Sequence, residues 1–396
     1  MFNKLEMAPP DAILGLTDAF KKDTRAEKIN LGVGVYKTAE NTTPILGAVK
    51  AAERLLLESE STKSYLPIPG AAGYCAAVRE LLFGAGHEII ANDRAVTAHT
   101  PGGTGALRVA SDFLHTLYPE KQIWVSNPTW ANHNAIFMAA GLTVQPYPYY
   151  DYENTCLDFD GMLTTLKIVP EGDIVLLHGC CHNPSGMDPD LDQWKAIAEV
   201  VYERNLLPMF DFAYQGFGDG LEEDAAGLRH FCQPGKELLI CSSFSKNFGL
   251  YNERCGAFTI VGADADGAQK AYSHMKIAIR TNYSNPPSHG AAVAEAILTT
   301  PELRQQWEDE LAAMRSRIAE MRQSFVDTLA RLGVEQDFSF ITRQKGMFSF
   351  SGLTKDQVNQ LREEFAIYIV GSGRINVAGM TPSNMDRLCT AIKAVL

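Results

Sequence analysis

From about residue 95 to residue 262, short apolar runs alternate with stretches long enough to form helices. The runs are QIWVS, DIVLLHG, LPMFDF, ELLICSS and GAFTIVG. Such runs, which lack alternating polar residues, are typical of strands that are buried on both faces. Because strands separated by helices usually pair in parallel, the pattern predicts an α/β fold in which helices cover a mostly parallel sheet.

In such sheets the ligand crevice lies beyond the carboxyl ends of the strands. The residues that follow each apolar run are therefore candidates for function. They are Trp130 in NPTW, Asn183 in CCHNPSG, Asp211 with Tyr214 in FDFAY, and Lys246 in SSFSK.

A long amphipathic helix is predicted over residues 299–333, because apolar residues recur there at intervals of three and four. Pro301 suits the first turn, and Gly333 suits the end. A helix of this length usually outgrows one domain. We expect it to connect a large domain, residues 44–313, to a small α/β domain formed by residues 12–43 and 314–396.

The overall composition excludes several classes of protein. A net charge of −12 argues against binding to nucleic acid or to an anionic membrane, since both need a basic surface. The eight cysteines contain no CxxC spacing, and the start MFNKLEMAPPDAIL lacks the apolar region of a secretory signal. No apolar run approaches the roughly 18 residues of a membrane span. We expect a cytoplasmic protein with reduced thiols.

The segment HGCCH, residues 178–182, is the one candidate metal motif. Zinc ligands are normally separated by at least two residues, and alternation along a strand would send these side chains to opposite faces. We therefore expect no metal.

Lys246 follows a buried run, with hydroxyl residues before it and an arginine eight positions later. This arrangement suits a lysine that binds pyridoxal 5'-phosphate covalently, with Ser243 and Arg254 at the phosphate. Gly103 and Thr104, which precede a helical pattern, offer free backbone N–H groups to the same phosphate. A solvated loop lysine is the structural alternative.

A pyridoxal ring needs a carboxylate beside its nitrogen, and Asp211 suits that role. Tyr214 and Asn183 can reach the phenolic oxygen, Trp130 can stack on the ring, and His133 can hydrogen-bond to Asp211. Each of these residues, taken singly, also has a purely structural interpretation.

Arg280 and Arg374 each interrupt a stretch with few charges. A guanidinium binds a carboxylate through two hydrogen bonds, so two such arginines indicate a substrate with two carboxylates. An ion pair within the chain is the alternative for each.

With these motifs assembled, the chain resembles the class I, fold-type I aminotransferases that depend on pyridoxal phosphate, in the bacterial aspartate and aromatic branch. The segments SFSKNFGLYNERCGA, HGCCHNPSG, FDFAYQGF, NYSNPP and GMFSFSGL carry the resemblance, which covers essentially the whole chain. It implies a seven-stranded large domain, a smaller domain, and an arm formed by residues 1–11.

The resemblance also implies roles for individual residues. Lys246 would be the cofactor lysine and proton shuttle, and Arg374, with Asn183 and the backbone at Gly34, would bind the substrate α-carboxylate. Relatives are homodimers, so Tyr65 and Arg280 would reach the partner's site, at the phosphate and the distal carboxylate respectively.

Two departures from the family pattern stand out. NPSG replaces the commoner NPTG, and a cis peptide is still expected before Pro184. Gly102 stands where some relatives have a serine.

The residues that differ in aromatic-preferring relatives look aspartate-like here: Val35, Lys37, Thr43, Thr104 and Asn285. The expected reaction converts L-aspartate and 2-oxoglutarate to oxaloacetate and L-glutamate. Three alternatives remain: an aromatic aminotransferase, a nicotinamide-dependent oxidoreductase, and a non-catalytic dimer. GVGVYK lacks the third glycine of a dinucleotide fingerprint, which counts against the second.

Overall fold

A computed structural model of the chain describes residues 1–7 and 14–396. These residues form two compact units. The small unit contains residues 1–43, 184–186 and 317–396, and the large unit contains residues 44–183 and 187–316. The long helix α12, Pro301–Arg331, contributes to both. Residues 8–11 of the predicted arm lie outside the described residues, and Met1–Met7 are exposed.

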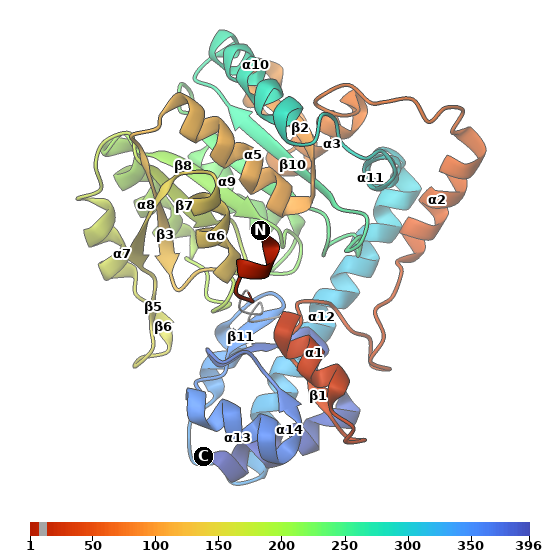
Figure 1. Cartoon of the computed structure of the whole chain (residues 1–396), viewed down its shortest axis with the longest axis vertical. Helices are drawn as coiled ribbons and strands as arrows, with labels where there is room; N and C mark the ends of the chain where they lie inside the picture. The colour runs from red at the N-terminus through yellow and green to blue at the C-terminus, as the bar shows by residue number, and fades with distance from the viewer. Residues whose placement is uncertain (8–13) are drawn as a thin grey trace. The chain divides into compact units, whose positions relative to one another are not determined.

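A seven-stranded sheet forms the centre of the large unit (Figure 1). Its strands, in spatial order, are β2 (Ala95–Pro101), β10 (Cys255–Val261), β9 (Leu238–Ser243), β8 (Leu207–Phe212), β7 (Ile174–His178), β3 (Gln122–Asn127) and β4 (Thr143–Pro148). Only β10 runs antiparallel to its neighbours. The predicted mostly parallel, seven-stranded α/β sheet is therefore confirmed.

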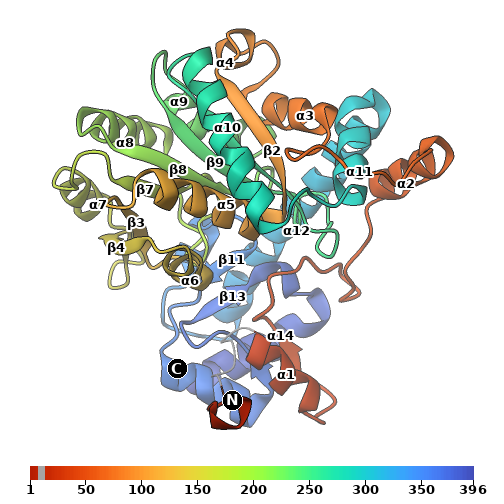
Figure 2. The ribbon, with the colours of Figure 1, turned by 45° about the horizontal axis from the view of Figure 1, so that its top comes forward.

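Helices cover both faces of this sheet (Figure 2). One face carries α5 (Gly102–Leu117), α6 (Ala131–Ala139) and α10 (Ala265–Asn282). The remaining helices of the large unit are α2 (Gly47–Ser59), α3 (Ala72–Phe83), α4 (Glu88–Ala91), α7 (Phe159–Leu166), α8 (Leu191–Glu203), α9 (Leu221–Phe231) and α11 (His289–Thr299). A short hairpin, β5 (Tyr150–Asp151) with β6 (Cys156–Leu157), completes the unit.

The core explains why the apolar runs form strands. Every residue of β7, β9 and β10 is buried, as the continuous apolar runs predict. Leu107, Phe113, Ile123, Met209 and Phe258 belong to the cluster between the sheet and α5. Because all strands of this sheet except β10 run in the same direction, their carboxyl ends lie at one edge of the sheet.

The small unit is built around two short strand pairs. Parallel β1 (Ile29–Asn30) and β12 (Ile367–Tyr368) form one pair, and antiparallel β11 (Phe348–Phe350) and β13 (Arg374–Asn376) form the other. Its helices are α1 (Leu14–Lys22), α13 (Lys355–Phe365) and α14 (Pro382–Val395), with short turns η1 (Phe2–Lys4), η2 (Ser339–Arg343) and η3 (Val377–Gly379).

Helix α12 confirms the predicted long amphipathic helix. Trp307, Leu311, Ile318, Phe325 and Leu329 are almost fully buried along its length. Gly333, just past its end, has φ +74°, which a glycine adopts without strain.

The expected cis peptide before Pro184 was wrong. In the part of the chain that the structure describes, the one cis peptide is Asn127–Pro128. The bond before Pro184 is trans, the isomer that an X–Pro bond favours unless its surroundings demand otherwise.

Within those same residues, no helix is both long and apolar enough to cross a lipid bilayer.

Candidate active site

The residues predicted to lie at the phosphate come together where β2, β10 and β9 lie side by side. Gly102 has φ +72°, and a Cβ atom there would lie 2.4 Å from Nη2 of Arg254. A Cβ on Gly103 would lie 3.0 Å from Cβ of Ser243. Glycine at both positions therefore lets the guanidinium and the serine approach the first turn of α5 closely.

The electrostatics of this group favour an anion. Gly102, Gly103 and Thr104 form the N-terminus of α5, where backbone N–H groups lack helical partners and the helix dipole is positive. Arg254 adds a full positive charge, and its Nη1 donates to Ser245 Oγ (3.2 Å) and to the carbonyl of Tyr251 (2.8 Å). A phosphate group matches this donor set.

Lys246 lies three residues beyond the end of β9, as predicted. Its Nζ atom sits 4.9 Å from the centroid of the Tyr214 ring, and Tyr214 is buried. The next residue, Asn247, is anchored through its carbonyl, which accepts a hydrogen bond from Trp307 Nε1 at 2.7 Å. A buried residue of α12 thus fixes the turn that carries Lys246.

Asp211 lies in β8, and its side chain is only 12% exposed. Its Oδ2 atom is 2.9 Å from Nε2 of His133, which is fully buried. Burial raises the pKa of Asp211, but the interactions with His133, and to a smaller extent with Lys246, outweigh it and hold the pKa below its ordinary value. The hypothesis that His133 pairs with Asp211 is confirmed.

A chain of hydrogen bonds extends from Asp211 into the protein. Nδ1 of His133 is 2.7 Å from Thr129 Oγ1, which is 3.1 Å from Nε2 of His178. The backbone N–H of Asn183 donates to Nδ1 of His178 at 3.3 Å. Because Nδ1 of His178 accepts this hydrogen bond, its Nε2 carries the proton and donates to Thr129 Oγ1. The Thr129 hydroxyl then donates to Nδ1 of His133, and Nε2 of His133 donates to Asp211.

Thr129 and His178 both belong to this series of hydrogen bonds, and neither role was predicted from the sequence. Burial lowers the pKa of His178 to about 3, so its ring is neutral, as the hydrogen-bond directions require. One signal could have found it: His178 ends β7 directly opposite Asp211 of β8 in the parallel register.

Trp130 and Asn183 complete the group at the carboxyl ends of the strands. Trp130 follows β3, is half-buried, and meets the His133 ring edge-on at 5.2 Å between centroids. Asn183 follows β7 and is buried. Four neighbouring strands of the large unit, β9, β8, β7 and β3, therefore position these side chains at or just after their carboxyl ends. The side chains are Trp130, Asn183, Asp211, Tyr214 and Lys246.

Arg374 and Gly34 belong to the small unit. Arg374 starts β13 and is buried; its Nη2 donates to the carbonyl of Gly32 at 2.7 Å. Its guanidinium carbon lies 4.2 Å from the centroid of the Phe348 ring. Gly34 packs on the same ring, since a Cβ there would lie 2.7 Å from Phe348 Cζ. Phe348 therefore orients both residues.

Tyr65 and Arg280 are surface residues of the large unit in a single chain. Tyr65 is 92% exposed, between α2 and α3. Arg280 is exposed near the end of α10, where its Nη1 donates to Ser284 Oγ.

The argument that alternation separates the cysteines of HGCCH was wrong. β7 ends at His178, so strand alternation does not extend to the cysteines. The thiols of Cys180 and Cys181 and the carboxylate of Asp224 lie within 4.8 Å of one another.

Comparison with known proteins supports the resemblance. The family model for "Aminotransferase class I and II" matches residues 26–392. The chain is 59% identical to an aspartate aminotransferase of Salmonella typhi and 58% identical to one of Escherichia coli (strain K12), covering 100% of both chains in each case.

A solved structure of an aromatic-amino-acid aminotransferase from Burkholderia pseudomallei, covalently bound to pyridoxal phosphate, is 50% identical. It superimposes with a TM-score of 0.98 over 100% of this chain and 99% of that chain. The predicted family and fold class are confirmed. The chain belongs to the class I and II aminotransferase family.

Proposed function

We propose that this protein is an aspartate aminotransferase that uses pyridoxal 5'-phosphate. It transfers the amino group of L-aspartate to 2-oxoglutarate, giving oxaloacetate and L-glutamate in two half-reactions. One observation carries the proposal: the amine of Lys246 lies 4.9 Å from the ring centroid of the buried Tyr214, at the same edge of the sheet as the bonded pair of Asp211 and His133. Two full-length relatives bear the same name.

The residues present fit the cofactor. Its phosphate matches the N-terminus of α5 at Gly103 and Thr104, together with Ser243 and Arg254. The close approach of Arg254 to Gly102 supports this, because a Cβ atom at residue 102 would lie 2.4 Å from Nη2 and the guanidinium would have to shift from its place beside α5. Pyridoxal phosphate supplies an aldehyde that binds amines and a ring that, when protonated, draws electrons from the substrate α-carbon.

The large unit's polar groups tune that ring. The low pKa of Asp211 keeps its carboxylate ionised, so it holds a proton on the ring nitrogen. The Tyr214 hydroxyl and the Asn183 amide would donate to the phenolic oxygen, and Trp130 would cover the ring face. His133 positions Asp211 through the hydrogen bond at 2.9 Å.

Lys246 moves the proton. Its neutral amine would take the proton from the substrate α-carbon and pass it, in the same half-reaction, to the cofactor carbon that bears the nitrogen. In the second half-reaction it would move a proton in the opposite direction. The turn that Trp307 fixes holds the Lys246 amine beside Tyr214. The amine nitrogen therefore needs little reorientation before it takes the proton.

The two substrate carboxylates bind to arginines. Arg374 holds the α-carboxylate with Asn183 and the backbone at Gly34, and its fixed orientation over Phe348 supports this role. We also propose a cytoplasmic homodimer in which Arg280 of one copy holds the distal carboxylate and Tyr65 the phosphate in the other's site. The exposure of both residues in one chain supports this, because a second copy would cover them.

The division into an arm (residues 1–11), a small domain (12–43 and 314–396) and a large domain (44–313) is part of the same proposal. The two compact units support it.

Aromatic amino acids are the second candidate substrates. The 50% identical relative from Burkholderia pseudomallei is named for them. Residues Val35, Lys37, Thr43, Thr104 and Asn285 favour aspartate by resemblance. Displacement of Arg280 would open the site to an aromatic ring.

The test compares kcat/KM for aspartate and phenylalanine, each with 2-oxoglutarate, in the unaltered protein and in Arg280→Ala. We expect aspartate to be preferred, and Arg280→Ala to lower kcat/KM for aspartate by roughly 10-fold to 100-fold, the value of a charged hydrogen-bonded pair. Phenylalanine turnover should be unchanged. Equal loss for both substrates would contradict the assignment of Arg280. Failure of aspartate to change the visible spectrum of the cofactor-loaded protein would contradict the function itself.

A further inference from the structure

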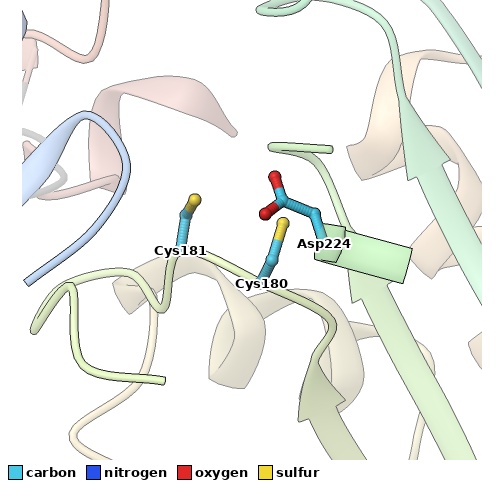
Figure 3. A group of neighbouring side chains, drawn as sticks. All are labelled: Cys180, Cys181 and Asp224. Carbon is cyan, nitrogen blue, oxygen red and sulfur yellow. The ribbon is translucent and has the colours of Figure 1, made fainter. Parts of the chain in front are cut away.

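We propose that Cys180, Cys181 and Asp224 form a binding site for one thiophilic divalent cation, such as Zn²⁺. Their two Sγ atoms and a carboxylate oxygen all lie within 4.8 Å of one another, and all three residues are buried (Figure 3). Two sulfur ligands about 2.3 Å from a tetrahedral zinc ion are roughly 3.8 Å apart. The two sulfur atoms therefore need to approach each other by no more than about 1 Å.

The backbone turns the two thiols to the same side. Cys181 has φ +53°, a left-handed conformation that residues other than glycine rarely adopt. The turn is held by Asp188, whose carboxylate accepts the N–H groups of Cys181 (2.6 Å) and His182 (2.8 Å). In Figure 3 the sulfur atoms of Cys180 and Cys181 point to one side of the loop.

Asp224 is fixed before any ion binds. It lies in the first turn of α9, where Oδ2 accepts the N–H groups of Gly216 (2.8 Å) and Gly218 (2.9 Å), and Oδ1 accepts that of Asp219 (2.8 Å). Carboxylates that bind metals are usually oriented by such hydrogen bonds. The carboxylate can therefore serve as a ligand at little further cost in side-chain entropy.

Two carboxylates lie beside the thiols, because Asp224 belongs to the group itself and Asp188 accepts the backbone N–H of Cys181. A divalent cation offsets their negative charge. On binding, each thiol gives its proton to solvent and forms a metal–sulfur bond, so one ion releases two protons. Two sulfurs and one oxygen select Zn²⁺ or Cd²⁺ over Mg²⁺ or Ca²⁺.

The first test uses the unaltered, cofactor-loaded protein after removal of metal with a chelator, in a reductant that contains no thiol. We expect it to bind one Cd²⁺ per chain, with an ultraviolet thiolate-to-cadmium band and release of two protons. X-ray absorption of the Zn²⁺ form should find two sulfur neighbours at about 2.3 Å. Fewer than two sulfur neighbours would overturn the proposal without any variant.

The second test uses variants, with thermal melting as the check on folding. Cys180→Ser and Cys181→Ser should each weaken Cd²⁺ binding by more than about 100-fold, because a direct ligand is worth at least as much as the outer groups that orient it. Cys156→Ser, at a half-buried thiol elsewhere in the large unit, is the matched control and should bind Cd²⁺ like the unaltered protein. Unchanged binding in the Cys180→Ser/Cys181→Ser double variant, or lost binding in Cys156→Ser, would overturn the site.

Discussion

Nε2 of the buried His133 lies 2.9 Å from Oδ2 of Asp211, so the carboxylate is paired even though little water reaches it. An ionised carboxylate is costly to bury alone, and the histidine offsets that cost. The hydrogen bond also fixes which oxygen faces His133 and leaves the other for a ligand. The pair therefore sets both the charge and the orientation of Asp211.

Replacement of this carboxylate should remove most of the activity. In Asp211→Asn the side chain carries no negative charge, so it would no longer hold a proton on the ring nitrogen of the cofactor. We expect kcat to fall by roughly 10²-fold or more, as when one electrostatic group at a reacting centre is removed. The control is Asp173→Asn, because Asp173 is also buried and bonded, accepting from Trp124 Nε1 at 2.9 Å beside the start of β7. That variant should lose stability but keep its kcat; similar losses in both variants would refute a role for Asp211 in turnover.

Thr129 should affect activity only through its hydroxyl group. Thr129→Val breaks the hydrogen-bond chain between His133 and His178, and one such bond is worth about 1 kcal/mol. We expect kcat to fall roughly 5-fold, with the pH profile moved in the direction of a higher pKa for Asp211. Thr129→Ser keeps the hydroxyl and should restore both kcat and the profile. If Thr129→Ser is as impaired as Thr129→Val, packing rather than hydrogen bonding explains the loss.

The strands of the large unit were predictable where both faces are covered. β3, β7, β8, β9 and β10 are continuous apolar runs, and each lies where the sequence predicted it. β2 and β4 were not recognised. β2 carries polar Thr97, His99 and Thr100, and β4 is an edge strand with Pro146 and Pro148, residues that interior strands exclude.

The site was predictable to the extent that the topology of parallel sheets controls it. The rule that ligands bind at the carboxyl ends of strands selected Lys246, Asp211, Asn183 and Trp130 without any knowledge of contacts. The left-handed turn at Cys181 was not predictable, because nothing local distinguishes a cysteine that adopts φ +53° from one in an ordinary loop. It depends on Asp188, seven residues later.

Lys246 should be required for both covalent cofactor binding and turnover. Lys246→Ala removes the amine that takes the α-proton, a contribution of about 10²–10⁴-fold. We expect at least that loss in kcat, together with loss of the visible band of lysine-bound cofactor. Lys236→Ala is the matched control, since Lys236 Nζ also lies over a tyrosine ring, 4.8 Å from the centroid of Tyr202. It should behave like the unaltered protein; a normal spectrum in Lys246→Ala would contradict the assignment.

His99 should make the protein less stable in mild acid. The side chain lies on β2 against Tyr74, and neither ring nitrogen has a hydrogen-bond partner among the described residues. Burial lowers its pKa to about 4, compared with about 6.5 when unfolded. As the pH falls from 6.5 to 4, the unfolded chain takes up a proton that the folded chain does not, so the free energy of unfolding falls.

The test for His99 compares urea unfolding near neutral pH and at about pH 5, where this one histidine should cost roughly 2 kcal/mol. His99→Gln keeps a polar side chain of similar size but does not titrate, so it should lose that much less stability on acidification. His274→Gln, at an exposed histidine of α10, is the control and should follow the unaltered protein. If His99→Gln loses as much stability between the two pH values as the unaltered protein does, then His99 is protonated as easily in the folded chain as in the unfolded one, and its burial has no effect on acid stability.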